Sequence, residues 1–164
     1  MIVPRPSERR TLMEVSLLEK IRAGEARVSV IGLGYVGLPL AVEFAKVGLT
    51  TVALDVDEDK IARLKRGESY IADVSDEDVQ AVIGTGSLCP TVDFSALSGV
   101  DTVDICVPTP LRKTRDPDLS FIVSAVDEIA KYLHKGQLVI LESTTYPGTV
   151  EEVVRPKLEA GGLR

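Results

Sequence analysis

The sequence has little of several residue types on which protein sites often depend. Its 164 residues include no tryptophan, one histidine and two cysteines, and aromatic residues make up 4% of the chain. The cysteines, Cys89 and Cys106, stand alone without the spacing of a disulfide framework. No spacing of histidine, cysteine or acidic residues predicts a metal site. Both cysteines are therefore interpreted as small apolar fillers.

Long apolar runs and an excess of basic residues are also missing. No segment approaches the roughly 20 apolar residues that span a bilayer, and the first residues lack the apolar core of a secretory signal. The net charge of −6 argues against nucleic acid as a partner. With 45% apolar residues, the chain can bury the core of one domain. We expect a soluble, cytoplasmic protein with neither a membrane nor a nucleic acid as its partner.

The charged residues that are present are unevenly spread. Lys and Arg are absent from residues 67–111 and then return together as Arg112, Lys113 and Arg115. A solvated basic loop and a loop that faces a phosphate both fit this cluster, so its role stays open. The acidic run from Glu68 to Asp78 is interpreted as a solvated connection.

The clearest pattern in the chain is an alternation of strand-like and helical segments. The strand-like runs are nearly continuous in apolar residues, as expected for a parallel sheet covered on both faces. They are Arg27–Ile31, Thr51–Asp55, Asp101–Val107, Leu138–Glu142 and a weaker run, Ser87–Val92. Helical patterns lie between them, at Tyr35–Val47, Asp57–Arg66 and Asp118–His134. The alternation predicts an α/β fold, a Rossmann-type doubly wound parallel sheet of five strands.

Two regions follow from this pattern. Residues 27–164 are predicted to form the sheet domain, and residues 1–26 a helical extension ahead of it. Thr11 and Glu14 have the spacing of a capping box that would open a short helix in the extension. This helix would either pack on the edge of the domain or make a subunit contact, and the sequence does not choose between the two.

The single histidine, His134, is predicted to lie in the last turn of the third helix, beside Lys135. Partial positive charge at that position complements the helix dipole. His134 is therefore interpreted as structural rather than catalytic.

The stretch "GLGYVG", residues 32–37, places three glycines between the first predicted strand and the first predicted helix. In a turn that binds a dinucleotide, Gly32 would allow the tight bend, Gly34 would let the backbone approach the pyrophosphate, and Gly37 would let helix and strand pack closely. Asp55 ends the second predicted strand at the spacing of a ribose-binding carboxylate. The next residue is Val56 rather than an arginine, which favours NAD over NADP. A glycine cluster without a ligand is the alternative.

Two later stretches, "VPTPLRKTRDPDLS" and "LESTTYPGTVEE", are more specific than the glycines. Together with "GLGYVGLPLAVEF" they closely resemble the NAD-binding domain of the UDP-glucose/GDP-mannose dehydrogenase family, the nucleotide-sugar 6-dehydrogenases. Within that family, "KTRDPDLS" and "ESTTYPGT" look most like the branch that acts on UDP-N-acetylhexosamines.

The resemblance implies roles for individual residues. Tyr35 and Val36 would offer backbone amides to the pyrophosphate, and Lys60 would lie beside Asp55 at the adenosine ribose. Other residues would line the cofactor from the opposite side, namely Val107, Pro108, Thr109, Ser143 and Thr144. Thr144 matches the position at which the family orients a catalytic water. Hydrogen bonding at the end of a strand is the alternative for Ser143 and Thr144.

The resemblance also implies a reaction, the oxidation of a sugar C6 hydroxyl to a carboxylate with two NAD⁺. A cysteine thiolate captures the aldehyde in this reaction, and it belongs to a "GGSCFPKD"-like motif that nothing in this sequence matches. We therefore expect the chain to bind NAD but not to catalyse, because the substrate domain is absent from it.

Association and function class complete the expectations. The resemblance implies a sixth strand that this sequence lacks. Without it the edge of the strand "LVILE" would be unpaired, which favours a homo-oligomer. The alternative function is an NAD(H)-sensing regulatory Rossmann module, with a methyltransferase ranked behind it. The regulatory module would have no reason to carry "VPTP" or "ESTTYPGT", and the glycine loop of a methyltransferase is usually less regular.

Overall fold

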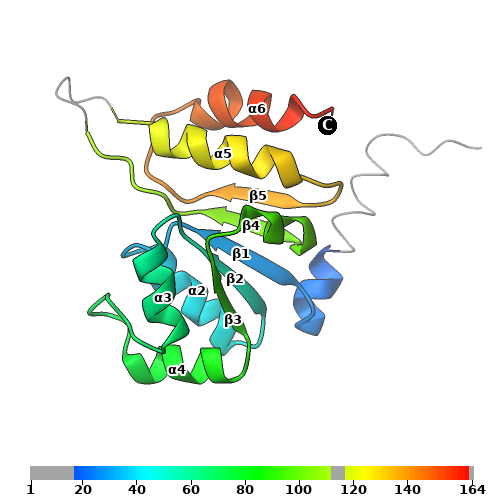
Figure 1. Ribbon diagram of the computed structural model, residues 1–164. Helices are drawn as coiled ribbons and strands as arrows, with labels where there is room; N and C mark the ends of the chain where they lie inside the picture. Colours follow the sequence, from blue (N-terminus) through cyan, green and yellow to red (C-terminus); the bar gives the residue numbers. More distant parts are fainter. Residues whose placement is uncertain (1–16, 112–116, 163–164) are drawn as a thin grey trace, which may run out of the picture.

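The computed structural model describes residues 17–111 and 117–162 and shows one five-stranded sheet, in the order β3-β2-β1-β4-β5 (Figure 1). All neighbouring strands are parallel. The strands are β1 (Arg27–Ile31), β2 (Thr50–Leu54), β3 (Leu88–Thr91), β4 (Thr102–Ile105) and β5 (Leu138–Leu141). The predicted Rossmann-type sheet is therefore confirmed. The capping box of Thr11 and Glu14 and the basic cluster at residues 112–115 lie outside the described residues.

Helices cover both faces of the sheet. One face carries α2 (Gly37–Lys46), α3 (Glu58–Lys65) and α4 (Asp76–Gly84), and the other carries α5 (Ser120–Tyr132) and α6 (Arg155–Glu159) (Figure 1). A 3₁₀ segment, η1 (Phe94–Gly99), precedes β4, and a π-helical turn, η2 (Val150–Val154), leads into α6. Among the described residues, no helix is long and apolar enough to cross a membrane.

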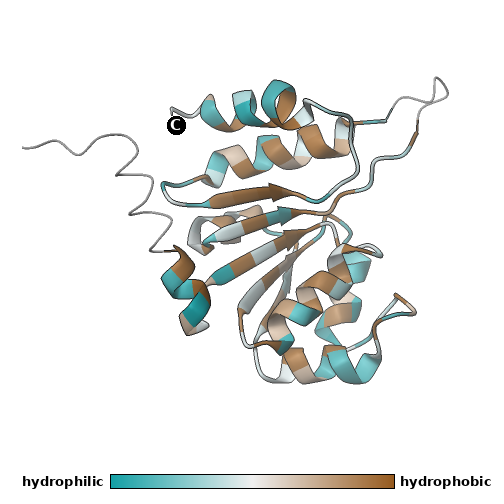
Figure 2. Ribbon diagram, turned by 180° about the vertical axis from the view of Figure 1, so that it is seen from behind, coloured by the Kyte–Doolittle hydropathy of each residue, from teal (hydrophilic) through white to brown (hydrophobic). Residues whose placement is uncertain are grey.

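The core is divided into two apolar clusters by the sheet. Alternate strand residues face opposite sides, so Val30 packs with α2 in one cluster while Ile31 packs with α5 in the other. Along the helices, hydrophobic and hydrophilic residues alternate, and the hydrophobic ones turn toward the sheet (Figure 2). This double coverage explains why the strands read as nearly continuous apolar runs.

The second predicted helix shows how local sequence sets an element's ends. Asp57 caps α3, because its carboxylate accepts hydrogen bonds from the amides of Asp59 at 3.0 Å and Lys60 at 3.3 Å. Basic residues occupy the last turn of the helix, where they complement the dipole. Gly67 follows with a φ of 76°, a left-handed conformation that ends many helices. The prediction of a helix over Asp57–Arg66 is therefore confirmed.

The interpretation of the acidic run as a solvated connection is wrong in two respects. Ile71 and Val74 are buried in the core, and Ser75 caps α4 by accepting a hydrogen bond from the Asp78 amide at 3.1 Å. The acidic side chains that follow the cap lie in the first turn of a helix, where the helix dipole favours negative charge. Asp78 also forms an ion pair of 3.0 Å with Lys46 on α2.

Candidate functional site

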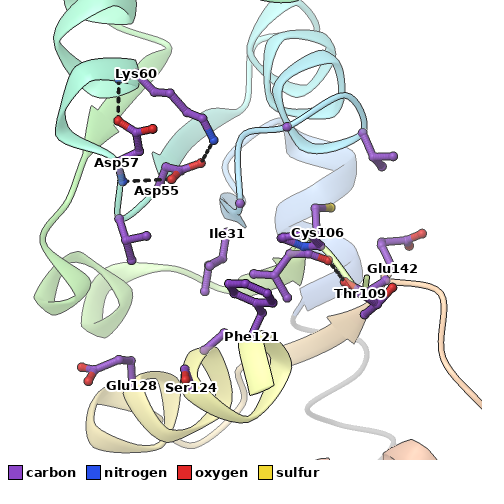
Figure 3. Close-up of a pocket in the computed structure, with 18 of the residues that line it drawn as sticks. Ile31, Asp55, Asp57, Lys60, Cys106, Thr109, Phe121, Ser124, Glu128 and Glu142 are labelled. Atoms are coloured by element: carbon purple, nitrogen blue, oxygen red, sulfur yellow. Dashed lines mark hydrogen bonds and ion pairs between the residues drawn. The ribbon is translucent and has the colours of Figure 1, made fainter. Parts of the chain in front are cut away.

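A pocket opens at the carboxyl ends of the strands, over the junction of β1 and β4 (Figure 3). The strand order reverses its direction of growth at this junction, since β2 lies on one side of β1 and β4 on the other. Ligands of open α/β sheets bind at such switch points. The pocket is lined by all the predicted cofactor residues except Gly37: Gly32, Gly34, Tyr35, Val36, Asp55, Lys60, Val107, Pro108, Thr109, Ser143 and Thr144.

The three glycines of the turn meet three different steric demands. Gly32 has a φ of 91°, and a Cβ there would lie 2.8 Å from the carbonyl oxygen of Cys106. At Gly37, a Cβ would lie 1.9 Å from the carbonyl oxygen of Gly32, so any side chain would separate the turn from α2. A Cβ at Gly34 would have no atom within 4 Å among the described residues, because this residue faces the open pocket. These spaces agree with the predicted roles of bend, close packing and approach to a ligand.

The amino end of α2 lacks the side-chain cap that neighbouring helices have. Its N-cap residue is Val36, which makes no capping hydrogen bond, and the first turn contains no acidic residue. In contrast, Asp57 and Ser75 cap α3 and α4, and the Asp118 carboxylate accepts from the first amide of α5 at 3.0 Å. Uncapped amides and the helix dipole together favour an anion from outside the chain.

Asp55 lies at the opposite side of the glycine turn with its carboxylate fixed by three hydrogen bonds. Oδ2 accepts from the Leu33 amide at 2.8 Å. It also accepts from Lys60 Nζ at 3.0 Å, and Oδ1 accepts from the Asp57 amide at 3.0 Å (Figure 3). The residue is 6% exposed, and its carboxylate oxygens can accept hydrogen bonds from hydroxyl donors. A carboxylate has about four acceptor positions, and three of them are occupied here. Two ribose hydroxyls could therefore both bind only if Lys60 no longer donates to Asp55.

The ends of β4 and β5 form the other wall. Ser143 Oγ donates to the carbonyl oxygen of Val107 at 2.7 Å and approaches that of Ile105 at 3.3 Å. The strand-end bonding considered for Ser143 is thus present, and it holds the two strand ends together below the pocket. Thr144 follows it, exposed and lining the pocket.

A third wall, formed by α5, was missed by the sequence analysis. Phe121 is 47% exposed although it is large and apolar, and Ser124 and Glu128 follow it along the pocket. Val56, which is 78% exposed, lines the pocket from the end of β2. The signal for this wall was the adjacent pair Phe121 and Ile122, since two neighbouring residues of a helix cannot both face one core. The apolar surfaces suit a flat ring such as a purine.

The chemistry available to the pocket excludes its one cysteine as a nucleophile. Burial, reinforced by the Asp104 and Glu142 carboxylates, raises the pKa of the Cys106 thiol to about 11. The thiol is therefore protonated at neutral pH. The interpretation of Cys89 as a filler is wrong, because this residue is exposed on β3. The described part of the chain also contains no group of three histidine, cysteine or acidic residues that could hold a metal ion.

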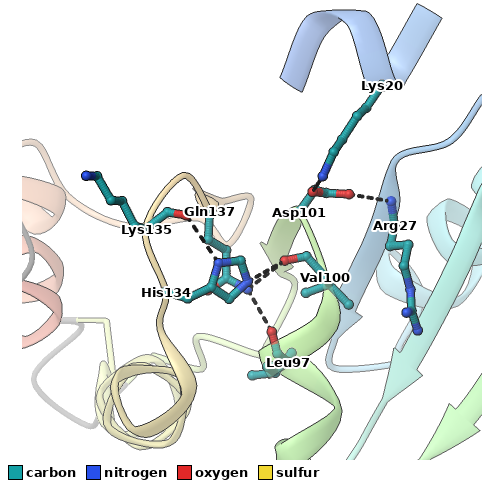
Figure 4. A network of polar contacts seen from close by, with 8 residues as sticks. All are labelled: Lys20, Arg27, Leu97, Val100, Asp101, His134, Lys135 and Gln137. Atoms are coloured by element: carbon teal, nitrogen blue, oxygen red, sulfur yellow. Dashed lines mark hydrogen bonds and ion pairs between the residues drawn. The ribbon is translucent and has the colours of Figure 1, made fainter. Parts of the chain in front are cut away.

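His134 lies at the far end of the sheet from the pocket. The helix α5 ends at Tyr132, two residues before the histidine, so the expected helical position is wrong and His134 belongs to the connection to β5. Its Nε2 donates to the carbonyl oxygen of Val100 at 2.9 Å (Figure 4). Gln137 donates to the same oxygen at 3.0 Å. These contacts join the start of β5 to the start of β4 and agree with a structural role.

The same end of the sheet anchors the helical residues 17–23. Asp101 accepts hydrogen bonds from the Arg27 amide at 2.9 Å and from the side chain of Lys20 (Figure 4). Lys20 thus ties this helical segment to the residue before β4, while Leu18 and Ile21 are each 45% exposed.

Comparison with known proteins connects this geometry to a family. The sequence model of the UDP-glucose/GDP-mannose dehydrogenase family, NAD binding domain, matches residues 26–162. The chain is 41% identical over 141 residues to UDP-N-acetyl-D-glucosamine 6-dehydrogenase of Pseudomonas aeruginosa, covering 85% of this chain and 32% of the relative. It is 38% identical over 139 residues to UDP-N-acetyl-D-mannosamine dehydrogenase of Pyrococcus horikoshii, covering 84% of this chain and 33% of that relative.

Solved structures give the same result. The chain superimposes on a ternary complex of GDP-mannose dehydrogenase from Pseudomonas aeruginosa with a TM-score of 0.79 and 35% identity, over 82% of this chain and 32% of that one. The chain therefore spans about a third of the length of the relatives that it matches.

Proposed function

The chain belongs to the UDP-glucose/GDP-mannose dehydrogenase family and contains its NAD-binding domain, and we propose that it is the cofactor part of an enzyme that oxidises a UDP-sugar. The reaction would convert the C6 hydroxyl of the sugar to a carboxylate with two NAD⁺. The observation that carries the proposal is the uncapped amino end of α2, beside the open space at Gly34 and the anchored carboxylate of Asp55.

Each part of the dinucleotide has residues suited to it. The amides around Gly34, Tyr35 and Val36 would bind the pyrophosphate. Asp55 would accept hydrogen bonds from the adenosine ribose, with Lys60 as a donor beside it. When bound, NAD⁺ would supply the hydride acceptor.

The far end of the pocket would receive the nicotinamide. Val107, Pro108 and Thr109 would line it, and Ser143 would hold the end of β5 against β4 through the bond to Val107. The exposed hydroxyl of Thr144 would orient the water that releases the acid product. Support for this assignment is the place of Thr144 at the pocket surface, directly after Ser143.

The substrate is proposed to be a UDP-N-acetylhexosamine. Relatives with this chemistry in their names are 36–41% identical to the chain. The chain alone is proposed to bind NAD without turnover, because it spans about a third of those relatives. We propose a homo-oligomer for the complete enzyme, testable by sedimentation. We also propose a cytoplasmic location, which the two free cysteines fit.

Calorimetric titration tests the proposal. NAD⁺ should bind the 164-residue chain more tightly than NADP⁺, because Asp55 repels a 2′-phosphate. For a substitution at Asp55, the matched control is Asp59→Asn, an exposed change on α3 one residue before Lys60. This control should leave both affinities unchanged. Failure to bind either dinucleotide would refute the proposed site. Formation of NADH after addition of UDP-N-acetylglucosamine or UDP-N-acetylmannosamine would refute the proposed inactivity of the chain alone.

A further inference from the structure

Tyr70 lies behind the glycine turn and not in the pocket wall. It belongs to the segment between α3 and α4, and its ring packs against the core cluster on the α2 side of the sheet. Its hydroxyl donates to the carbonyl oxygen of Leu33 at 2.8 Å. A residue that is 37 positions away along the chain thus contacts the backbone at the second residue of "GLGYVG".

Leu33 is the residue through which the turn is fixed. Its amide donates to Asp55 Oδ2 at 2.8 Å, its carbonyl oxygen accepts from Tyr70, and its side chain is fully buried. The residues on either side are Gly32 and Gly34, which have the greatest conformational freedom in the turn. Both peptide groups of Leu33 therefore act as anchors for backbone that would otherwise be loosely held.

Two cations hold the ring of Tyr70 in place. Lys60 Nζ lies 5.9 Å from the ring centroid and Arg63 Cζ lies 5.5 Å from it, both within the range of a cation–π contact. Lys60 is also the partner of Asp55 at 3.0 Å. Burial, together with the carboxylates of Asp55 and Asp57, raises the pKa of the Tyr70 phenol well above its usual value. The hydroxyl is therefore a neutral donor throughout the physiological range.

We propose that Tyr70 is a positioning residue that holds the glycine turn in the conformation that receives the pyrophosphate. This inference rests on the proposed function, since it assumes that a dinucleotide binds at the turn. A turn held before binding loses less conformational entropy when the ligand arrives, so the hydrogen bond to Leu33 contributes to affinity as well as to the fold. Its effect should be confined to the part of the ligand that contacts the turn.

The variant Tyr70→Phe tests this proposal because it keeps the ring, its packing and its contacts with Lys60 and Arg63. We expect NAD⁺ and ADP to bind about three- to tenfold more weakly, the effect of one lost hydrogen bond. Adenosine, which has no phosphate, should bind within about twofold of the wild type. Tyr132→Phe removes the same hydroxyl from α5, where the ring packs in the other core cluster, and should change none of the three affinities. Calorimetry measures the affinities for NAD⁺ and ADP, and NMR titration measures the affinity for adenosine.

The outcomes separate this inference from the proposed function. If the wild type binds NAD⁺ and Tyr70→Phe binds all three ligands equally well, the inference fails and the proposed function stands. An equal loss for adenosine and ADP, or a variant that does not fold, would show that Tyr70 is only structural and would also overturn the inference. A wild type that binds no NAD⁺ refutes both.

Discussion

Gly34→Ala should weaken cofactor binding strongly while leaving the fold intact. A Cβ at this position would meet no atom within 4 Å among the described residues, and the φ of Gly34 lies outside the left-handed region. Adding the methyl group therefore causes no clash in the free protein. It restricts the unfolded chain, which should raise stability by about 0.4–1 kcal/mol. The free energy of unfolding of the variant should thus be equal to or above that of the wild type.

The same methyl group would occupy the space through which the pyrophosphate approaches the backbone. Loss of one charge-assisted hydrogen bond costs about 1.5–3 kcal/mol, which corresponds to a roughly 10- to 150-fold weaker affinity for NAD⁺. Stability and affinity are therefore expected to change in opposite directions, which a general disturbance of the fold would not produce.

Gly37→Ala is the matched control for this experiment. Its Cβ would lie 1.9 Å from the carbonyl oxygen of Gly32, so backbone must move, at a cost of about 1–3 kcal/mol or more. In a domain of this size that lowers the melting temperature by roughly 2–12 °C. Thermal unfolding and NAD⁺ titration of both variants give the comparison. If Gly34→Ala melts lower than the wild type, or binds NAD⁺ equally well, the geometric reasoning about the turn is wrong.

Two other substitutions have separate expected outcomes. Asp55→Asn removes the negative charge but leaves Lys60 beside the ribose position, so the preference for NAD⁺ over NADP⁺ should fall by at least about tenfold in calorimetry. Equal discrimination before and after the change would contradict the role given to Asp55. Burial and the nearby Glu142 carboxylate raise the pKa of Asp104 to about 6, so its ionisation should weaken the folded state as the pH rises from about 4 to 6. The free energy of unfolding of the wild type, relative to that of Asp104→Asn, should therefore fall by about 2–3 kcal/mol across this interval. Melting temperatures measured against pH follow this change, and parallel profiles for the two proteins would refute the assignment.

Local sequence signals were sufficient for most of the fold. The first strand was predicted at Arg27–Ile31 and is found there, because its apolar run begins after a polar segment and ends at Gly32. The second helix was set by its cap and by its charge distribution. The glycines, Asp55 and the ends of β4 and β5 were predicted to meet, and parallel strands do bring their carboxyl ends to one edge of the sheet.

The features that sequence reasoning missed depend on contacts between distant residues. The helix α4 has only two fully buried side chains, Val79 and Val82, so its periodic signal is weak. Its position is set by capping at Ser75 and by the Asp78 contact with Lys46 on another helix. The bond from Tyr70 to Leu33 joins residues from two segments whose proximity only the folded sheet creates.

One signal of the site is local and could be read in other sequences of this kind. Val36 is at the N-cap of α2, although β-branched apolar residues are among the poorest caps. A helix that begins in this way loses about 0.5–2 kcal/mol relative to one capped by a serine or an aspartate. Two other helices on the same face of the sheet, α3 and α4, have such a side chain in Asp57 and Ser75. The amides offered to a phosphate are those of the turn around Tyr35 and Val36, because the Leu38 amide donates to the carbonyl oxygen of Gly34 and Pro39 has no amide hydrogen. The glycines beside α2 give a phosphate room to reach them.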